Sequence, residues 1–299
     1  MDRTAPAPIV NALSIDVEDY YQVQALSAVC ARADWDRYAS RVERNTDIIL
    51  EILSDARVRA TFFTLGWIAE RHPALVRRIA GAGHEIASHG LAHFRVDSQT
   101  PSEFRTDIRA AKIILEDIAG CAVNGYRAAT FSLGPHTQWA WPVLEEEGYA
   151  YSSSVYPISS DFHAFANAPR TPYRPAGTAK LLEIPIATIR AMGRNWPSGG
   201  GGYFRLLPYR FSRAAIARIN QHERRPAVFY LHPWELDPGQ PRMRGLSAKS
   251  RVRHYLNLSR TGARLRRLTK DFHWDRMDAV FHTGDMTGTP PAQDHAIGT

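Results

Sequence analysis

The sequence predicts one α/β domain whose strands run mostly parallel and close into a barrel. Short apolar segments of strand length alternate with segments in which apolar residues recur at helical spacing, and this alternation is typical of parallel sheets connected by helices. At least seven such strand segments occur, without an internal repeat or a dividing linker. Polar residues recur where these strands end. In barrel enzymes, the carboxyl ends of the strands carry the chemistry.

Length and composition fit this prediction. The chain has 299 residues, of which 44% are hydrophobic and 22% are charged, as expected for a protein with a sizeable core. We expect a single domain over residues 1–285 and a flexible tail over 286–299. The start of the chain lacks the apolar core of a signal peptide, and no stretch approaches the roughly 18 apolar residues of a membrane helix. Cys30 and Cys121 have no CxxC spacing. We therefore expect a cytoplasmic protein without an integral membrane segment.

The formal net charge is +7, and much of the excess lies in residues 241–270, which hold ten Lys and Arg residues and no acidic residue. Such a run is compatible with nucleic acid, with an anionic glycan or with a membrane surface. The favoured interpretation is a helix that docks through Leu265, Leu268 and Phe272 and exposes its basic face to water. We therefore predict no nucleic-acid partner. No pattern in the sequence specifies an oligomeric state.

The strands are predicted from short apolar, β-branched and aromatic runs. In chain order they cover residues 9–15, 61–65, 83–87, 123–127, 149–153, 181–188, 227–231 and 279–281. The helices are predicted from apolar spacing and from their start and stop signals. They cover residues 36–55, 73–81, 100–118, 139–147, 214–219 and 247–272. The third of them begins at a capping box, Thr100-Pro101-Ser102-Glu103. The glycine run 199–202 is either a flexible turn or a loop whose backbone approaches a ligand.

Two histidines follow the strand over residues 83–87, in the segment Ser88-His89-Gly90-Leu91-Ala92-His93. Imidazole is the commonest protein ligand for zinc-like ions, and two histidines four apart can bind one ion if the loop turns helically. In a chain with 12 histidines, such a pair also arises by chance. The interpretation as a metal site therefore depends on a third ligand, a base and an acid from elsewhere in the chain.

Those groups occur at the ends of other predicted strands. The first strand ends in Asp16-Val17-Glu18-Asp19, and side chains two apart on a strand share a face, so Asp16 and Glu18 point into one cavity. Arg127 and His232 end two later strands. Acidic residues in a solvent loop would be unremarkable, but at a buried strand end they are costly and indicate function.

At this point the chain resembles the polysaccharide deacetylases of carbohydrate esterase family 4, and within them the branch associated with exosortase (PEP-CTERM) exopolysaccharide systems. Six motifs in the family's order carry the resemblance: 14–21 (SIDVEDYY), 88–93 (SHGLAH), 125–132 (GYRAATFS), 151–157 (YSSSVYP), 200–205 (GGGYFR) and 230–235 (YLHPWE). Ala129 stands where the family usually has proline, and Ser152 where it often has aspartate. The carboxylate ligand is commonly aspartate, so Glu18 and the neighbouring Asp19 both remain candidates.

The resemblance implies a distorted (β/α)7-type barrel, in which residues 150–285 form a family-specific extension. It implies that Glu18, His89 and His93 hold a divalent cation, zinc in the first instance, and that the substrate is an amino-sugar polysaccharide. Asp16 would be the base, Arg127 its ion-pair partner and His232 the acid. The resemblance also suggests that Tyr203 and Trp234 stack on sugar rings. The implied reaction is removal of N-acetyl groups during exopolysaccharide biosynthesis.

Two other functions stay open at this stage. Some relatives of this barrel are amidases that act on a small ring amide or ureide, and residues 157–180 and 194–205 would set such a specificity. A glycan-binding protein that keeps the fold without turnover is the other alternative. The presence of the base, the acid and the histidine pair in one chain favours an enzyme.

Overall fold

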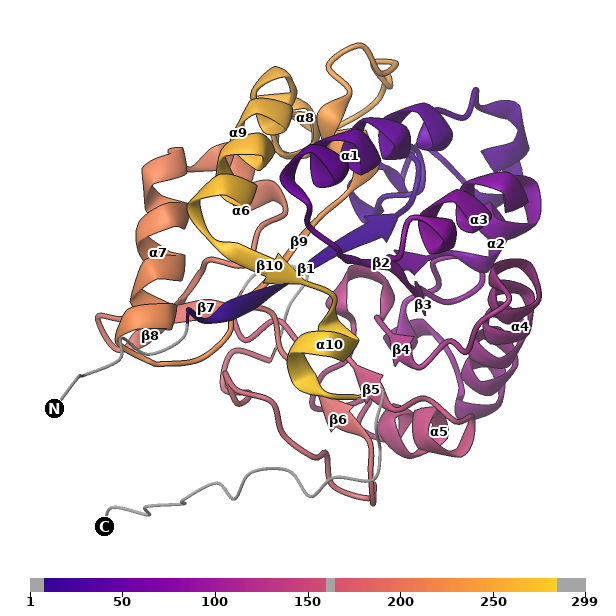
Figure 1. The fold of residues 1–299 in the computed structure, drawn as a ribbon. Coiled ribbons are helices and arrows are strands. Elements are labelled where there is room, and N and C mark those ends of the chain that lie inside the picture. Colours follow the sequence, from indigo (N-terminus) through magenta and orange to yellow (C-terminus); the bar gives the residue numbers. More distant parts are fainter. Residues whose placement is uncertain (1–7, 160–164, 284–299) are drawn as a thin grey trace, which may run out of the picture.

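The computed structural model describes residues 8–159 and 165–283, which form a curved parallel sheet surrounded by helices (Figure 1). The strands of this sheet are β1 (Val10–Val17), β2 (Thr61–Thr64), β3 (Glu85–Ser88), β4 (Gly125–Tyr126), β5 (Tyr151–Ser152), β6 (Leu182–Glu183), β9 (Val228–Leu231) and β10 (His273–Asp275). β1 pairs with β9 on one side and with β2 on the other, and the sheet continues in order to β6. β10 pairs with the amino-terminal part of β1. The predicted fold class, a parallel α/β barrel, is confirmed.

The gap between β6 and β9 is bridged by irregular backbone. Ala187 donates its N–H to the carbonyl of Val228 at 3.1 Å, and Tyr230 donates its N–H to the carbonyl of Gly199 at 2.8 Å. A Cβ on Gly200 would lie 2.0 Å from the carbonyl oxygen of Tyr230, and the φ angle of Gly200 is +104°, so this position requires glycine. The glycine run is therefore not a free turn, because its close contact is with β9, and its last residue, Gly202, lines the cavity described below.

Helices cover the outside of the sheet (Figure 1). They are α1 (Val42–Ala56), α2 (Gly66–Arg71), α3 (Pro73–Gly81), α4 (Pro101–Ala119), α5 (Ala140–Glu146), α6 (Gly202–Leu206), α7 (Tyr209–Gln221), α8 (Ala248–Tyr255), α9 (Leu258–Asp271) and α10 (Met277–Phe281). The capping box predicted for α4 is formed, since the Thr100 and Glu103 side chains each accept the other residue's backbone N–H. None of the described helices is long and apolar enough to span a membrane.

Short elements complete the connections. Within the described residues, five 3-10 turns lie between the strands and helices: η1 (Gln24–Leu26), η2 (Arg32–Arg37), η3 (Val96–Ser98), η4 (Ala129–Phe131) and η5 (Pro233–Leu236). A separate antiparallel hairpin consists of β7 (Thr188–Ala191) and β8 (Arg194–Pro197). The predicted strand over 181–188 is therefore divided between β6 and β7.

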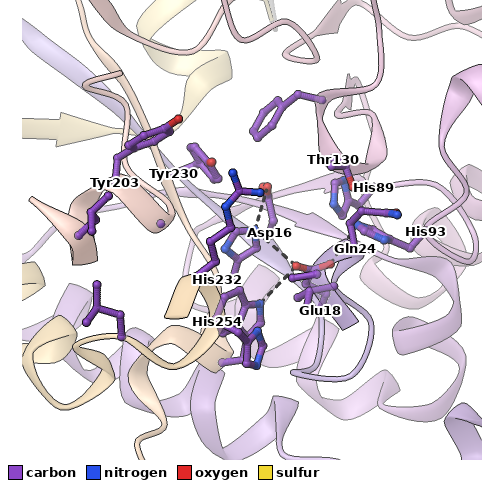
Figure 2. Close-up of a pocket in the computed structure, with 18 of the residues that line it drawn as sticks. Asp16, Glu18, Gln24, His89, His93, Thr130, Tyr203, Tyr230, His232 and His254 are labelled. Carbon is purple, nitrogen blue, oxygen red and sulfur yellow. Dashed lines mark hydrogen bonds and ion pairs between the residues drawn. The ribbon is translucent and has the colours of Figure 1, made fainter. Parts of the chain in front are cut away.

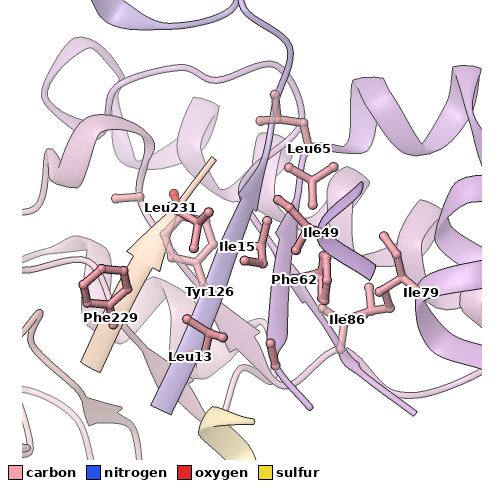
Figure 3. Close-up of a cluster of buried hydrophobic side chains, with 14 of the residues drawn as sticks. Leu13, Ile15, Ile49, Phe62, Leu65, Ile79, Ile86, Tyr126, Phe229 and Leu231 are labelled. Atoms are coloured by element: carbon pink, nitrogen blue, oxygen red, sulfur yellow. The ribbon is translucent and has the colours of Figure 1, made fainter. Parts of the chain in front are cut away.

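Side chains of β1 alternate between two apolar layers. Leu13 and Ile15 pack in the layer between the sheet and the helices (Figure 3), whereas Ala12 belongs to the cluster on the inner side of the curved sheet. Burial of each such Leu or Ile side chain contributes about 1.5–3 kcal/mol. Because successive strand residues point to opposite sides, Asp16 lies on the inner side with Ala12, and Glu18 follows it. The alternation that builds the core thus also aims the two carboxylates inward.

The amino-terminal end of the sheet is closed by α10 and contains a buried carboxylate of its own. Glu85 accepts hydrogen bonds from the Thr61 hydroxyl at 2.5 Å and from the Tyr151 hydroxyl at 2.8 Å. Burial, and then the nearby charge of Asp278, raise the pKa of Glu85 to about 7. Residues 279–281, which the sequence predicts as a last strand, are part of α10. A short apolar run fits strand and helix equally well, so periodicity alone does not separate them.

The basic segment 241–270 is mostly helical, and α9 docks on the domain as predicted through the buried Leu265 and Leu268. Arg266 pairs with Asp55 at 2.8 Å on the surface. The sequence predicts that the basic side chains of this helix face water, and Arg264 is an exception. Its guanidinium is half-buried and donates to the backbone carbonyls of residues 204, 205 and 207, so it ties α9 to the end of α6. The predicted tail, 286–299, lies outside the described residues.

Candidate active site

The carboxyl-terminal ends of β1, β3 and β9 meet at a cavity of about 330 Å³ (Figure 2). Seven of the eight site residues expected from the sequence line it together: Asp16, Glu18, His89, His93, Tyr203, His232 and Trp234. Arg127, at the end of β4, is fully buried directly behind Asp16. Residues that lie more than 200 positions apart in the chain therefore form one site.

Glu18, His89 and His93 form a cluster suited to a metal ion. Each offers one ligand atom, and these atoms lie within 4.8 Å of one another. His93 Nε2 is 3.0 Å from Glu18 Oε2, yet that oxygen accepts no hydrogen bond from any described residue. A buried carboxylate oxygen without a donor is costly unless a cation lies beside it. Two imidazoles and one carboxylate are a common protein ligand set for a divalent ion with open positions.

The loop between the two histidines does not turn helically. Instead, Gly90 has φ 77° and His93 has φ 54°, both in the left-handed region. A Cβ on Gly90 would lie 2.8 Å from the Asp107 carboxylate, which accepts the backbone N–H of Leu91 at 3.1 Å. Arg32 donates to the carbonyl of His93 at 2.6 Å. A left-handed non-glycine residue is strained, so these contacts hold the His93 imidazole at the cluster.

The hydrogen bond on the back of His89 fixes which nitrogen faces the cavity. His89 Nδ1 lies 2.8 Å from the carbonyl oxygen of Arg127, so Nδ1 carries the proton and Nε2 is left as a ligand atom. Burial lowers the pKa of His89 to about 4, and burial lowers the pKa of His93 well below its usual value. Both rings are therefore neutral near pH 7, as metal ligands must be. Burial also raises the pKa of Glu18 to about 7.

Asp16 is held by two other strands. Arg127 Nη1 donates to Asp16 Oδ1 at 2.5 Å and to the Ser14 hydroxyl at 2.9 Å. The other side of the guanidinium donates to the Ser153 carbonyl and hydroxyl, both at 3.0 Å. These bonds fix one oxygen of Asp16 and leave Oδ2 toward His232, whose Nε2 is 3.9 Å away.

His232 is oriented by a second buried ion pair. Its Nδ1 lies 2.7 Å from Glu235 Oε1, and Glu235 Oε2 accepts from Arg205 Nε at 2.5 Å. Burial opposes the charged form of His232, but the hydrogen bond with Glu235 and the charges of Glu18, Glu235 and Asp16 together raise its pKa to about 9. Although burial opposes the charged carboxylate, Arg205 and His232 bring the pKa of Glu235 down to about 2. The Nε2–H edge of a charged imidazole thus faces the cavity.

The geometry separates the two carboxylates that the sequence left as alternatives. Asp19 is turned away from the cavity, where it accepts the Ser40 hydroxyl at 2.8 Å and the backbone N–H of Arg41 at 2.7 Å. Its oxygens hold the chain ahead of α1. Glu18 is the carboxylate that lies with His89 and His93.

The two aromatic residues suggested for sugar stacking differ in their surroundings. Trp234 is buried, stacks on the rings of His232 and His254, and donates its indole N–H to Glu18 Oε1 at 3.3 Å. Trp234 thus supports the rings of the site and also lines the cavity, and its role in sugar stacking stays a prediction. Tyr203, on α6, is half-buried and lines the cavity, so the suggested stacking position remains open to it.

Several supporting residues were not assigned a role from the sequence. Glu235 follows His232 by three positions, which is a capping-box spacing, and this signal was available. Ser14 and Ser153 lie within two of the motifs but give no signal of their own. Arg205 was part of a quoted motif, yet nothing local indicates that its guanidinium reaches Glu235. That contact depends on how α6 and η5 pack.

The fold and site define a class, which is a parallel (β/α) barrel with a candidate metal cluster at the carboxyl ends of its strands. Within that class, residues 35–151 match the family model for polysaccharide deacetylase. Residues 153–282 match a domain of unknown function, DUF3473. The two matches meet at Ser152, the last residue of β5, and β5 pairs with β6 in the same sheet. Together with the relatives below, the first match supports placing the chain among the polysaccharide deacetylases.

Two curated relatives are deacetylases of amino-sugar compounds. A chitooligosaccharide deacetylase of Bradyrhizobium sp. (strain ANU 289) is 26% identical over 145 residues, which are 48% of this chain and 60% of the relative. A peptidoglycan-N-acetylglucosamine deacetylase of Bacillus cereus is 40% identical over 77 residues, which are 26% of this chain and 28% of the relative. The chain therefore spans less than two thirds of the length of each of these relatives.

Solved structures support the fold. A protein described as a polysaccharide deacetylase from Mycobacterium smegmatis aligns with a TM-score of 0.61 at 21% identity, over 97% of this chain and 96% of that one. A protein described in the same way from Pseudomonas aeruginosa PAO1 aligns with a TM-score of 0.60 at 16% identity, over 95% and 93%. An allantoinase aligns with a TM-score of 0.58 at 16% identity, over 93% and 91%.

Proposed function

We propose that the protein is a metal-dependent hydrolase that removes N-acetyl groups from an amino-sugar polysaccharide. One observation carries this proposal: the Glu18–His89–His93 cluster faces both Asp16 and His232 across a single cavity. A cluster of ligands, a fixed carboxylate and an oriented imidazole are the groups that hydrolysis of an amide requires. The deacetylase relatives support the choice of an N-acetylated sugar as substrate.

Zinc is the ion we propose, because two imidazoles and one carboxylate suit it and leave positions open for water and substrate. A divalent ion in this cluster would supply Lewis-acid polarisation of the acetyl carbonyl and a water of lowered pKa. The chain's own contribution is the neutral Nε2 atoms of His89 and His93 and the otherwise unsatisfied Oε2 of Glu18.

Asp16 is proposed as the base that takes the proton of the attacking water. Arg127 holds Oδ1 at 2.5 Å, so Oδ2 is the oxygen that is free to accept a proton. A carboxylate fixed in this way does not need to reorient during the reaction, and such positioning lowers the barrier.

His232 is proposed as the acid that protonates the leaving nitrogen. Its Nδ1 is engaged by Glu235, so only Nε2–H can be delivered into the cavity. Arg205 fixes Glu235 in turn, and the acid therefore has a rigid support of the kind that orients histidines in other hydrolytic sites. A histidine acid contributes typically about 10²–10⁴-fold.

A role in exopolysaccharide biosynthesis, in an exosortase-associated system, is the finer proposal. This finer proposal rests on the motif resemblance over residues 14–235. In it, the substrate is a polymer that is processed in the cytoplasm. The alternative is an amidase for a small ring ureide, which the structural similarity to an allantoinase favours.

The test is to incubate the purified protein with N-acetylglucosamine oligomers and to measure released acetate, before and after treatment with a chelator. We expect acetate release that stops on chelation and returns when zinc is added back. Allantoin and a glucosamine oligomer without acetyl groups serve as parallel substrates. Hydrolysis of allantoin without acetate release from the oligomers would overturn the proposal in favour of the amidase.

A further inference from the structure

We propose that the outer half of the active-site cavity is a binding site for an aliphatic chain carried by the amino-sugar substrate. This inference rests on the proposed function, since it concerns the same cavity. The chain would be either an N-acyl group longer than acetyl or an aglycone attached to the sugar. Both sources share the chemistry of consecutive methylene groups, and the test below separates them.

The cavity has two halves of different chemistry. The inner half contains the charged and imidazole groups at the strand ends (Figure 2). The outer half is lined by aliphatic side chains from three elements: Val23 and Ala25 of the η1 segment, Leu206 of α6, and Val252 and Leu256 of the α8 segment. Tyr203 lies in the same wall.

Two of these side chains are unusually exposed for their size. Leu206 and Val252 each keep 55% of their surface exposed. Among the described residues, few large hydrophobic side chains are as exposed, and Ile113 and Met192 are others that lie outside this cavity. Scattered exposed apolar residues need no explanation. Leu206 and Val252 lie on different helices and line the same cavity, and exposed apolar residues that gather at one site mark binding surfaces.

The chemistry of this half favours methylene groups over a sugar ring. A sugar ring presents hydroxyl groups, and each of them loses free energy when it is buried against aliphatic carbon without a hydrogen bond. The polar side chains of Gln24 and Arg253 also line the cavity, and Gln24 donates its amide to the Ser27 hydroxyl. A methylene chain, by contrast, gains from every CH₂ removed from water, by about fourfold in affinity for each one that is fully buried.

The wall is also rigid enough to be a preformed site. Arg205, on α6, donates to the backbone carbonyls of Arg253, His254 and Leu256 at 2.8, 3.0 and 2.9 Å. These bonds fix α8 against α6, so the surfaces of Leu206 and Val252 are held in place before a ligand arrives. Preorganisation of this kind lowers the cost of binding.

The experiment compares matched substrates on the metal-loaded protein. The first arm uses the hexyl and the methyl glycosides of di-N-acetylchitobiose, and the second uses N-hexanoyl and N-acetyl glucosamine oligomers. We expect kcat/KM to favour the hexyl or hexanoyl compound at least about tenfold in one arm, which identifies where the chain is attached. In the Leu206→Gln, Val252→Gln double variant, we expect that ratio to fall to about threefold or less. Ile113→Gln, an equally exposed aliphatic residue on α4, is the matched control and should keep the ratio.

A binding measurement separates this inference from the proposed function. We expect calorimetric titration of chelator-treated protein to give a Kd for the chain-bearing compound at least about tenfold below that for its short counterpart. If this difference appears without any turnover, the aliphatic site stands and the deacetylase proposal falls. Equal Kd values and equal kcat/KM values in both arms, or a preference that survives in the double variant, would overturn the aliphatic site.

Discussion

The two ends of the sheet both bury carboxylates, and they treat them in opposite ways. At the amino-terminal end, Glu85 is surrounded by the hydroxyl groups of Thr61 and Tyr151. At the carboxyl-terminal end, Glu18 has an oxygen to which no described residue donates, and Asp16 is bound to a buried arginine. A buried acid is therefore not in itself a sign of chemistry. The sign is a buried acid with an open position toward a cavity.

This difference follows from what each environment supplies. The hydroxyl groups of Thr61 and Tyr151 donate to both oxygens of Glu85, so neither oxygen is left without a donor. Around Glu18 and Asp16 the chain supplies charges and imidazoles, and it leaves Glu18 Oε2 without a donor among the described residues. The first end therefore stabilises the fold, and the second is available for a reaction. The predictions below test that division.

The largest effect is expected from removal of the histidine ligands. His89→Ala or His93→Ala should abolish stoichiometric binding of a divalent metal and the associated activity, because two donors are too few to hold the ion. Elemental analysis and circular dichroism measure occupancy and folding. His84→Ala, which removes a buried histidine at the amino-terminal end, is the matched control and should keep the metal. Full occupancy in a His89→Ala, His93→Ala double variant would contradict the assignment.

Replacement of the base should leave the metal in place. Asp16→Asn keeps the shape of the side chain but cannot take a proton, so turnover should fall by at least about 10²-fold while elemental analysis shows full occupancy. A loss of metal together with turnover would instead place Asp16 among the ligands.

The proposed role of His232 as the acid is tested by changing the leaving group of the substrate. His232→Ala should slow amide substrates by about 10²-fold or more, since an amine leaves only with a proton. The rate of hydrolysis of activated esters should fall by less than about tenfold, because their leaving groups need little protonation. The rates of both substrate types are measured on the same preparation. Equal losses for esters and amides would show that His232 positions the substrate instead.

The amino-terminal end should respond in stability rather than in activity. The pKa of Glu85 is raised to about 7 by burial and by Asp278, so its stabilising contribution is complete below pH 4.5 and is lost as the pH rises through 7. Glu85→Gln removes this dependence. The wild type should therefore lose up to about 3 kcal/mol more unfolding free energy than Glu85→Gln between pH 4 and pH 8. Denaturant titration of both proteins at pH 4 and pH 8 measures this difference. Equal changes in unfolding free energy for the wild type and Glu85→Gln would refute the prediction.

The smallest effect is expected at the exposed basic face. Arg266 pairs on the surface with Asp55 and Glu51, and Arg267 lies over the ring of Tyr209. Exposed pairs contribute about 0–1 kcal/mol, so Arg266→Glu with Arg267→Glu should change turnover on a neutral oligosaccharide by about twofold or less. A tenfold loss, relieved by salt, would show that this face binds an anionic substrate.

The sequence predicts the position of the site because two simple rules act together. Alternation along β1 and β9 aims Asp16, Glu18 and His232 to the inner side, and parallel pairing brings the carboxyl ends of these strands to one edge. Both rules are visible in a single sequence. For the same reason, the fold class follows from the order of the predicted strands and helices.

What the sequence did not predict depends on contacts between distant segments. The support of His232 needs Arg205 to reach η5, and the half-buried position of Arg264 needs α6 to end against α9. Neither has a local pattern. The last helix was assigned as a strand because a three-residue apolar run has no period to measure. The loop over residues 89–93 has left-handed backbone at Gly90 and His93. Only the glycine at position 90 could have indicated this conformation from the sequence.

The pairing of β1 with β9 has a consequence for how the molecule is made. The Ser14 hydroxyl bonds the carbonyl of Phe229, 215 positions later in the chain. During synthesis, β1 therefore waits with an unpaired, mostly apolar edge until most of the polypeptide has emerged. Contacts of such long sequence separation are slow to form, and an open strand edge is prone to pair with other chains. The nascent protein thus holds the proposed base and the proposed metal ligands long before the proposed acid, His232, is in place, and the proposed site is complete only when β9 has paired with β1.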